Sequence, residues 1–253
     1  MNETFNYNEA KGLNVLRVLK PAFKKGMLYI RSEDHKIGMR TGLMWNTPWI
    51  HSGGDSPTDR NCVLFHGLIL QYCNFIPAKC QQCWKVVARP NTVAQLMKLC
   101  ELQQASDRDS KAGIEIRPSV GGNYGAYWYN DSIEEGEECR QFVRNLCDEY
   151  LGKDVQVFLK RGCTEFEHKF GASNEWKITE GSREAERIIT DAVVIDGYAD
   201  RSQPDYLIED IKLKWIEFAY ERGDMTYLEF TDGKPLYPAY VKYQSNPEME
   251  EAV

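Results

Sequence analysis

The fold is decided by the stretch from Trp84 to Lys160, which opens with WKVVARPNTVAQLMKLCELQQ at residues 84–104. Its first six residues are rich in valine and stop at Pro90, a pattern typical of a buried strand. The apolar residues that follow recur at the spacing of one helix face, at Val93, Leu96, Met97 and Cys100. The opening therefore predicts a strand followed by a helix over residues 91–104.

The remainder of the stretch repeats this alternation of strands and helices. A second strand (112–117) is followed, after the turn SVGGN, by an aromatic third strand, YGAYWY (124–129). The residues SIEE form a capping box that begins a second helix over 132–151, and VQVFLK (155–160) forms a fourth strand. The order βαββαβ predicts a ferredoxin-like centre over about residues 84–160.

The sequence predicts one compact α+β domain over residues 1–253, with α/β elaborations at both ends of the ferredoxin-like centre. No segment rich in glycine, proline or serine divides the chain. We expect a core over residues 73–170 and packed extensions over 1–72 and 171–253. The extensions contain these predicted elements: a hairpin of strands 26–31 and 37–45, helices over 60–72, 182–192 and 205–222, and a closing hairpin of strands 225–230 and 236–243.

Charge and hydropathy narrow the classes of partner. The chain has 31 Lys and Arg against 38 Asp and Glu, and its net charge is −7. This balance disfavours nucleic acid, since phosphate backbones are bound by basic surfaces, and favours a small molecule or a protein as partner. No apolar run is long enough to span a membrane, and the first residues lack the basic and apolar regions of a secretory signal. We therefore expect a soluble, cytoplasmic protein without a membrane partner.

The chain has eight cysteines, which a reducing cytosol would keep as thiols. Three of them lie on the apolar stripes of the two predicted central helices, at Cys100, Cys139 and Cys147, and are expected in the core. Cys80 and Cys83 form a CxxC motif, whose spacing lets two sulfurs bind one ion.

The predicted topology brings a third cysteine to this motif. In a βαββαβ sheet the first and fourth strands are antiparallel neighbours, so residues before the first lie beside residues after the fourth. Cys80 and Cys83 precede the first strand and Cys163 follows the fourth. We expect Cys73 as fourth ligand, because it is nearest in sequence, with His66 and Cys62 as reserves on the helix predicted before it.

Cys73, Cys80, Cys83 and Cys163 are thus the predicted ligands of zinc or of a [4Fe–4S] cluster, both of which take four thiolates. The alternative is a set of buried thiols without metal. The C-x6-C-x2-C spacing of the first three is similar to the iron–sulfur loop of helix-hairpin-helix DNA glycosylases. That loop has a fourth cysteine six positions later, where this chain has Arg89, so the glycosylase activity is not carried over.

Two phrases of the sequence, CWKVVARP (83–90) and LKRGCTEFE (159–167), resemble uncharacterised proteins of marine tailed phages. The resemblance covers the middle of the chain and implies no activity.

Candidate catalytic residues follow directly after Cys163. Glu165 and Glu167 share one face if this segment is an extended strand, and His168 adjoins them, so the three could act as acid and base. The alternative is a solvated strand face. A nucleophilic Cys163 beside His168 would compete with the metal site.

Three functions remain open from the sequence. The first is a metal-supported enzyme with the two glutamates and His168 beside its substrate. The second is a non-catalytic binding module whose metal is structural. The third is a nucleic-acid-processing accessory factor that uses the aromatic strand 124–129, which partly resembles the third strand of RNA-recognition folds. An exposed Tyr124 and Trp128 would favour the third function.

Overall fold

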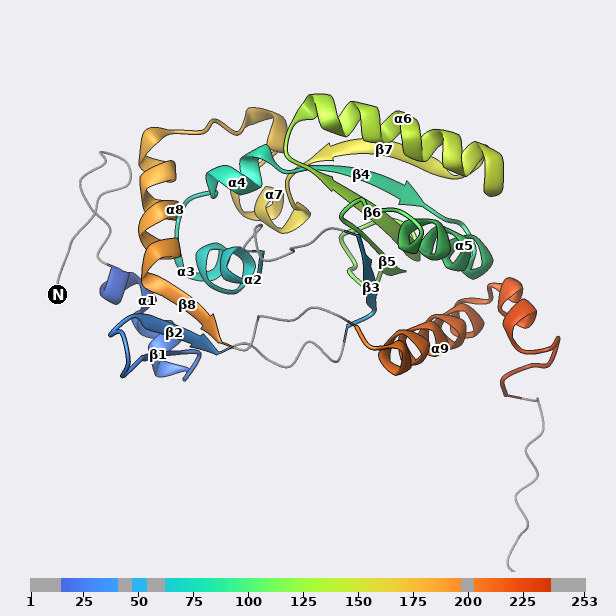
Figure 1. Ribbon diagram of the computed structural model, residues 1–253, viewed down its shortest axis with the longest axis horizontal. Coiled ribbons are helices and arrows are strands. Elements are labelled where there is room, and N and C mark those ends of the chain that lie inside the picture. The colour runs from blue at the N-terminus through green and yellow to red at the C-terminus, as the bar shows by residue number, and fades with distance from the viewer. Residues whose placement is uncertain (1–14, 41–46, 54–61, 197–202, 238–253) are drawn as a thin grey trace, which may run out of the picture.

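The computed structural model describes residues 15–40, 47–53, 62–196 and 203–237, and within these ranges the protein is a mixed α+β structure with two sheets (Figure 1). The larger sheet has the strand order β3-β5-β6-β4-β7 and consists of β3 (Trp49–Ser52), β4 (Trp84–Arg89), β5 (Ser110–Ile114), β6 (Tyr124–Asn130) and β7 (Gln156–Arg161). The smaller sheet has the order β1-β2-β8 and consists of β1 (Leu28–Ile30), β2 (Ile37–Arg40) and β8 (Val193–Asp196).

The central strands pair as the sequence predicts. β4 lies between β6 and β7 and is antiparallel to both, so the predicted pairing of the first and fourth strands is confirmed. Trp84 at the start of β4 is opposite Arg161 at the end of β7. The two connecting helices are α5 (Val93–Gln104) and α6 (Ile133–Tyr150). The predicted cap of α6 is present, since the Ser132 side chain accepts a hydrogen bond from the Glu135 amide.

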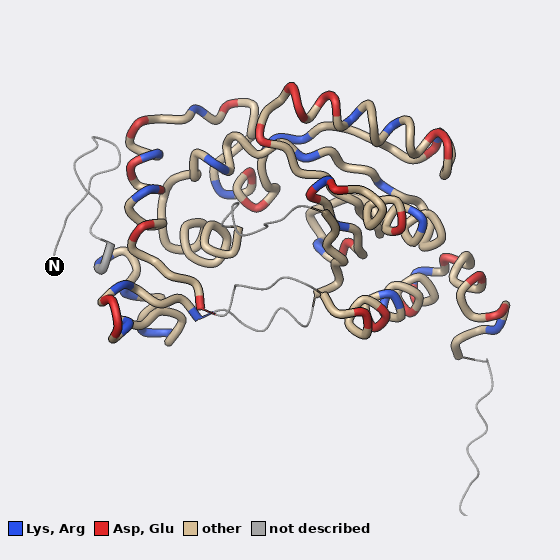
Figure 2. Tube along the Cα trace, in the orientation of Figure 1, with Lys and Arg blue, Asp and Glu red and all other residues tan. Residues whose placement is uncertain are grey.

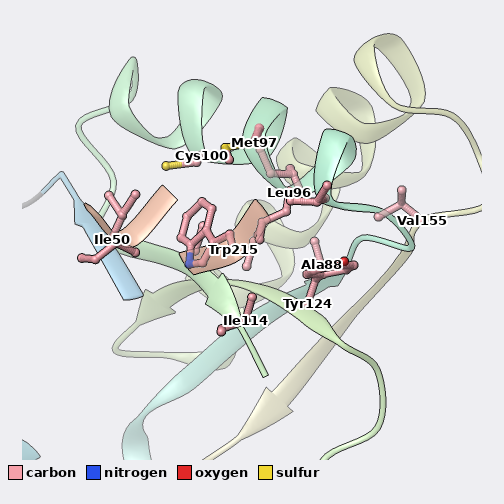
Figure 3. Close-up of a cluster of buried hydrophobic side chains, with 14 of the residues drawn as sticks. Ile50, Ala88, Leu96, Met97, Cys100, Ile114, Tyr124, Val155 and Trp215 are labelled. Atoms are coloured by element: carbon pink, nitrogen blue, oxygen red, sulfur yellow. The ribbon is translucent and has the colours of Figure 1, made fainter. Parts of the chain in front are cut away.

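The first hydrophobic core fills the face of the large sheet that α5 and α6 cover (Figure 3). Alternate residues of β4, Val86 and Ala88, point into it, and α9 (Asp205–Arg222) adds the fully buried Trp215. The cysteines predicted for this core are confirmed there: Cys100, Cys139 and Cys147. Tyr124 and Trp128 are also buried in it, so the aromatic strand does not present these two rings to a nucleic acid.

Asp224, directly after the end of α9, is hydrogen-bonded to residues of this core. Its carboxylate accepts hydrogen bonds from the amide of Val93, at 2.6 Å, and from the hydroxyl of Tyr124, at 2.7 Å. It also accepts two from Thr226, so it caps the 3-10 helix η3 (Met225–Phe230). The sequence predicted a strand here; this prediction was wrong, because the Asp224 cap turns the chain where a strand would begin. The predicted partner strand lies mostly outside the described residues.

We expect Asp224→Ala to lower the free energy of unfolding by about 2–3 kcal/mol, because hydrogen bonds to a charged group are lost and their donors stay partly buried. Asp210→Ala is the matched control: Asp210 lies on the exposed side of α9, pairs with Lys214, and should change stability by less than about 0.5 kcal/mol. Urea unfolding followed by circular dichroism measures both; equal losses would contradict the role of Asp224.

A second hydrophobic core lies on the other side of the molecule, between the small sheet and a group of helices. It receives Phe65, Leu68 and Phe166, all at most 1% exposed. The helices are α1 (Val15–Lys24), the continuous run of α2 (Cys62–Leu64), the π-helix η1 (Phe65–Ile69) and α3 (Leu70–Tyr72), then α4 (Ala78–Gln82), α7 (Thr164–Phe170), the 3-10 helix η2 (Ser173–Glu175) and α8 (Glu180–Ala192). None of the described helices is both long and apolar enough to cross a membrane.

The elements predicted in the extensions are present in part. β1 and β2 form the predicted hairpin as far as Arg40, beyond which residues 41–46 are not described. The helices predicted over 182–192 and 205–222 are confirmed as α8 and α9. The helix predicted over 60–72 is found from Cys62, but the π-helix in its middle shifts the register by which its faces were predicted.

Candidate functional site

Polar and charged side chains gather on the face of the large sheet opposite the first core. Because side chains alternate along a strand, Lys85 points away from the Val86 face, and its directly paired neighbours Tyr129 and Lys160 share its face. Figure 2 shows basic residues on the adjacent strands β4 and β7. This face meets α7 and the π-helix, which belong to the second core. The site therefore lies where the two cores adjoin.

The turn at Gly162 positions Cys163 at this junction. Gly162 connects β7 to α7 with φ +64°, a conformation that glycine adopts without strain, and a Cβ atom here would lie 2.3 Å from the Trp176 ring. Its amide donates a hydrogen bond to the carbonyl of Cys83, at 2.8 Å. The segment that carries Cys163 is thereby held beside the CxxC motif, on the edge where the sequence predicted it.

The thiol of Cys163 is the centre of a small polar cluster. Lys85 Nζ donates to Cys163 Sγ at 3.1 Å, and a ring nitrogen of His66 lies within 4.8 Å of the same sulfur. Lys85 is buried, whereas Cys163 is half-buried. His66 comes from the π-helix and its ring packs edge-on against Phe166, with 5.4 Å between centroids. π-helical turns are often found at functional sites.

These neighbours make Cys163 acidic. Burial by itself would raise the pKa of the thiol, but the charge of Lys85 and the hydrogen bond and charge of His66 outweigh it and lower the pKa to about 6. Burial raises the pKa of Cys73 to about 12 and that of Cys100 to about 11. Cys163 is therefore a thiolate at neutral pH, while these two cysteines remain thiols.

A chain of ion pairs borders the cluster. Arg117 Nη1 donates to Glu165 Oε1 at 2.5 Å, and Arg117 also binds both carboxylate oxygens of Glu115, at 2.5 and 2.8 Å. The Tyr127 hydroxyl donates to Glu115 at 3.1 Å. Burial opposes ionisation of Glu165, but its own backbone amide and Arg117 lower the pKa of its carboxyl to about 2. Glu165 is therefore a fixed negative charge rather than a proton donor at neutral pH.

The predicted strand after Cys163 is wrong: residues 164–170 form the helix α7. Successive side chains on a helix are about 100° apart, so Glu165 and Glu167 do not share a face. Glu165 pairs with Arg117, whereas Glu167 pairs with Lys160 and accepts the Ser173 hydroxyl hydrogen bond at 2.7 Å. His168 is exposed. The three predicted catalytic residues therefore point to different surroundings.

The structure distributes the predicted metal ligands unevenly. Among the described residues, the group of potential ligand atoms that all lie within 4.8 Å of one another comprises His66, Cys163 and Glu165. Of the four predicted cysteines it contains only Cys163; burial raises the pKa of the Cys80 thiol, and the charges of Cys163, Cys62 and Cys83 raise it further. The charge that acts on the buried Cys73 is that of Lys169, whose Nζ binds the Cys73 carbonyl oxygen at 2.7 Å.

Sequence reasoning missed Lys85 and Arg117. A lysine inside an otherwise apolar strand, as in WKVVAR, is the signal that could have found the first, because a buried ammonium needs a charged partner. Burial lowers the pKa of Lys85, but the charges of Cys163 and Cys83 raise it further, so the lysine stays protonated. Arg117 carries no comparable signal in the sequence.

No family model, no curated protein and no solved structure matches this chain. Function is therefore inferred from the geometry around Cys163.

Proposed function

We propose that the protein is an enzyme that uses the thiolate of Cys163 as a nucleophile. The observation that carries this proposal is the hydrogen bond that Lys85 donates to the half-buried Cys163 sulfur at 3.1 Å, with a ring nitrogen of His66 within 4.8 Å of the same sulfur. A thiolate that accepts a hydrogen bond from a buried ammonium has the surroundings of a reactive thiol, whereas structural cysteines lie in apolar surroundings.

We infer that the substrate is an acyl compound, because a thiolate readily attacks an acyl carbon. The Cys163 thiolate forms an S–C bond with the acyl carbon, the bond from that carbon to the leaving group breaks, and protonated His66 gives its proton to the leaving group. Water then attacks the thioester and gives a proton to neutral His66, so a carboxylic acid is released and the thiolate returns. Lys85 keeps its proton throughout and balances the charge of the sulfur.

A ferredoxin-like description of the central unit is supported by the strand order β5-β6-β4-β7, in which every neighbouring pair is antiparallel. In this arrangement two helices cover one face of the sheet and leave the other for a site. The proposed catalytic residues use that second face. We include both extensions in one domain, because His66 of the first extension lies beside Cys163 and Trp215 of the second is buried in the first core.

A second candidate function is a metal centre with zinc or a [4Fe–4S] cluster. It is favoured by the convergence of His66, Cys163 and Glu165 within 4.8 Å, and by Cys80 and Cys83 nearby. The ammonium group of Lys85, 3.1 Å from the sulfur, opposes it because it would repel a metal cation.

Metal analysis separates the two candidates. We expect protein purified with and without oxygen to be colourless, to contain zinc and iron far below one atom per chain, and to react with iodoacetamide at Cys163 without a chelator. One zinc per chain, or brown protein with iron, that disappears in Cys163→Ser would favour the metal centre instead. Arg187→Met, on the exposed side of α8, is the control for any effect of purification.

A further inference from the structure

A pocket of about 290 Å³ opens on the Lys85 side of the large sheet. Its walls carry four cationic side chains: Lys85 and Arg89 from β4, Arg117 from the loop after β5, and Lys160 from β7. Its apolar part is formed by Val87, Tyr127 and Phe158. Ser119, Val120, Gly121 and Thr164 complete the lining, which contains no carboxylate.

The charge of this pocket is unusual for a chain with net charge −7. The acids that pair with its cations, Glu115 and Glu165 with Arg117, and Glu167 with Lys160, lie outside its lining. In the described part of the chain no carboxylate pairs with Arg89, whose guanidinium lies 4.9 Å from the centroid of the Phe158 ring. Burial, together with the charges of Lys85 and Arg117, also lowers the pKa of nearby Lys111 to about 8. Arg89 is thus the pocket cation left without an anionic partner, while Arg117, Lys160 and Lys85 turn their charges towards the pocket from pairs whose acids and thiolate lie outside its lining.

We propose that this pocket binds the phosphate group of a small organic phosphate monoester, and, resting on the proposed function, that a ligand of this class whose organic part carries an acyl group is the substrate of Cys163. A phosphate offers three oxygens and up to two charges to donors that arrive from several sides. The apolar wall suits the organic part of the ligand, and the volume lies at the small end for ligand pockets.

The pocket adjoins the thiolate of Cys163. Lys85 lines the pocket and also donates to Cys163 Sγ at 3.1 Å, while Thr164, the next residue along the chain, lines the same pocket. A ligand anchored by its phosphate would therefore hold its organic part close to the sulfur, which is the positioning that covalent catalysis requires.

Calorimetric titration with phenyl phosphate, benzoate and phenol tests the pocket. We expect phenyl phosphate to bind more tightly than benzoate, and phenol not to bind. Arg89→Met and Lys160→Met should each weaken the binding of phenyl phosphate at least about tenfold, because each removes a charged donor. The matched controls, Arg187→Met and Lys98→Met, remove exposed cations outside the pocket and should leave the affinity unchanged. Absent binding, preference for benzoate, or equal effects of pocket and control variants would overturn the proposal.

Two further measurements separate this inference from the proposed function. Saturating phenyl phosphate should slow alkylation of Cys163 by iodoacetamide about tenfold or more, and lack of protection would overturn the placement of the ligand beside the sulfur. Cys163→Ser should still bind phenyl phosphate, since its loss of binding would mean that the sulfur, rather than the cations, holds the ligand. An unreactive Cys163 in protein that binds phenyl phosphate would remove the enzyme and leave the phosphate site; a reactive Cys163 without phosphate binding would do the reverse.

Discussion

At about pH 6.5, iodoacetamide should alkylate Cys163 of the unaltered protein about ten times faster than Cys163 of the Lys85→Met variant. The thiol has a pKa of about 6, and losing the lysine would move it towards its ordinary value of 9.0. The thiolate fraction would then fall by about two orders of magnitude, while the more basic thiolate would become roughly tenfold or more nucleophilic. Mass spectrometry of the labelled peptide at a series of pH values gives both rate and midpoint.

The sign of the pH dependence is fixed by the lowered pKa. In the unaltered protein the rate should rise with pH through a midpoint near 6 and then level off, because the thiolate is the reacting form. Above about pH 9.5 both proteins are ionised at this sulfur, so the advantage of the unaltered protein should vanish or reverse. Lys98→Met is the control and should match the unaltered protein. An unchanged midpoint in Lys85→Met would contradict the role of Lys85.

Gly162→Ala should lower the free energy of unfolding by about 3 kcal/mol or more and should also slow alkylation of Cys163. An alanine at φ +64° costs about 1–2 kcal/mol, and the added methyl would overlap the Trp176 ring, which a Cβ atom would approach to 2.3 Å. Relief of that overlap must shift the start of α7, and with it the sulfur, away from Lys85. Urea unfolding and peptide labelling measure the two effects.

Gly223→Ala is the matched control for this substitution. Gly223 ends α9 in the left-handed region with φ +73°, and no atom lies within 4 Å of a Cβ added there, so only the backbone cost should be seen. The difference between the two variants isolates the contact with Trp176, and Trp176→Ala should relieve much of the cost in the double variant. Equal destabilisation by both alanines would mean that the ring yields freely and does not position Cys163.

The order of central elements could be predicted because each is dictated by local patterns that the tertiary structure reinforces. The valine-rich run of β4 arises from burial on both faces of the sheet, and the stripe of α5 arises from burial against one of these faces. The pairing of β4 with β7, and hence the meeting of Cys83 and Cys163, followed from the connectivity alone. These inferences needed no knowledge of side-chain positions.

The rest of the site depends on features that a local pattern does not encode. His66 reaches Cys163 from a π-helix, whose register differs from the 3.6-residue repeat by which helix faces are predicted. The sequence predicts a strand at Glu165 because the segment is too short to display a helical stripe, whereas α7 begins directly after the turn at Gly162. Arg117 meets Glu165 across 48 positions of sequence, a contact set by packing.

Partial unfolding of either hydrophobic core should disable the site around Cys163, because the two cores hold different parts of it. Lys85 belongs to a strand whose other face packs into the first core, whereas Cys163 packs against the second. Local opening of either core would separate sulfur from ammonium while much of the chain kept its hydrogen bonds. Cys163 would then revert to an ordinary thiol. Its high reactivity should therefore be lost at a lower temperature than the bulk of the secondary structure.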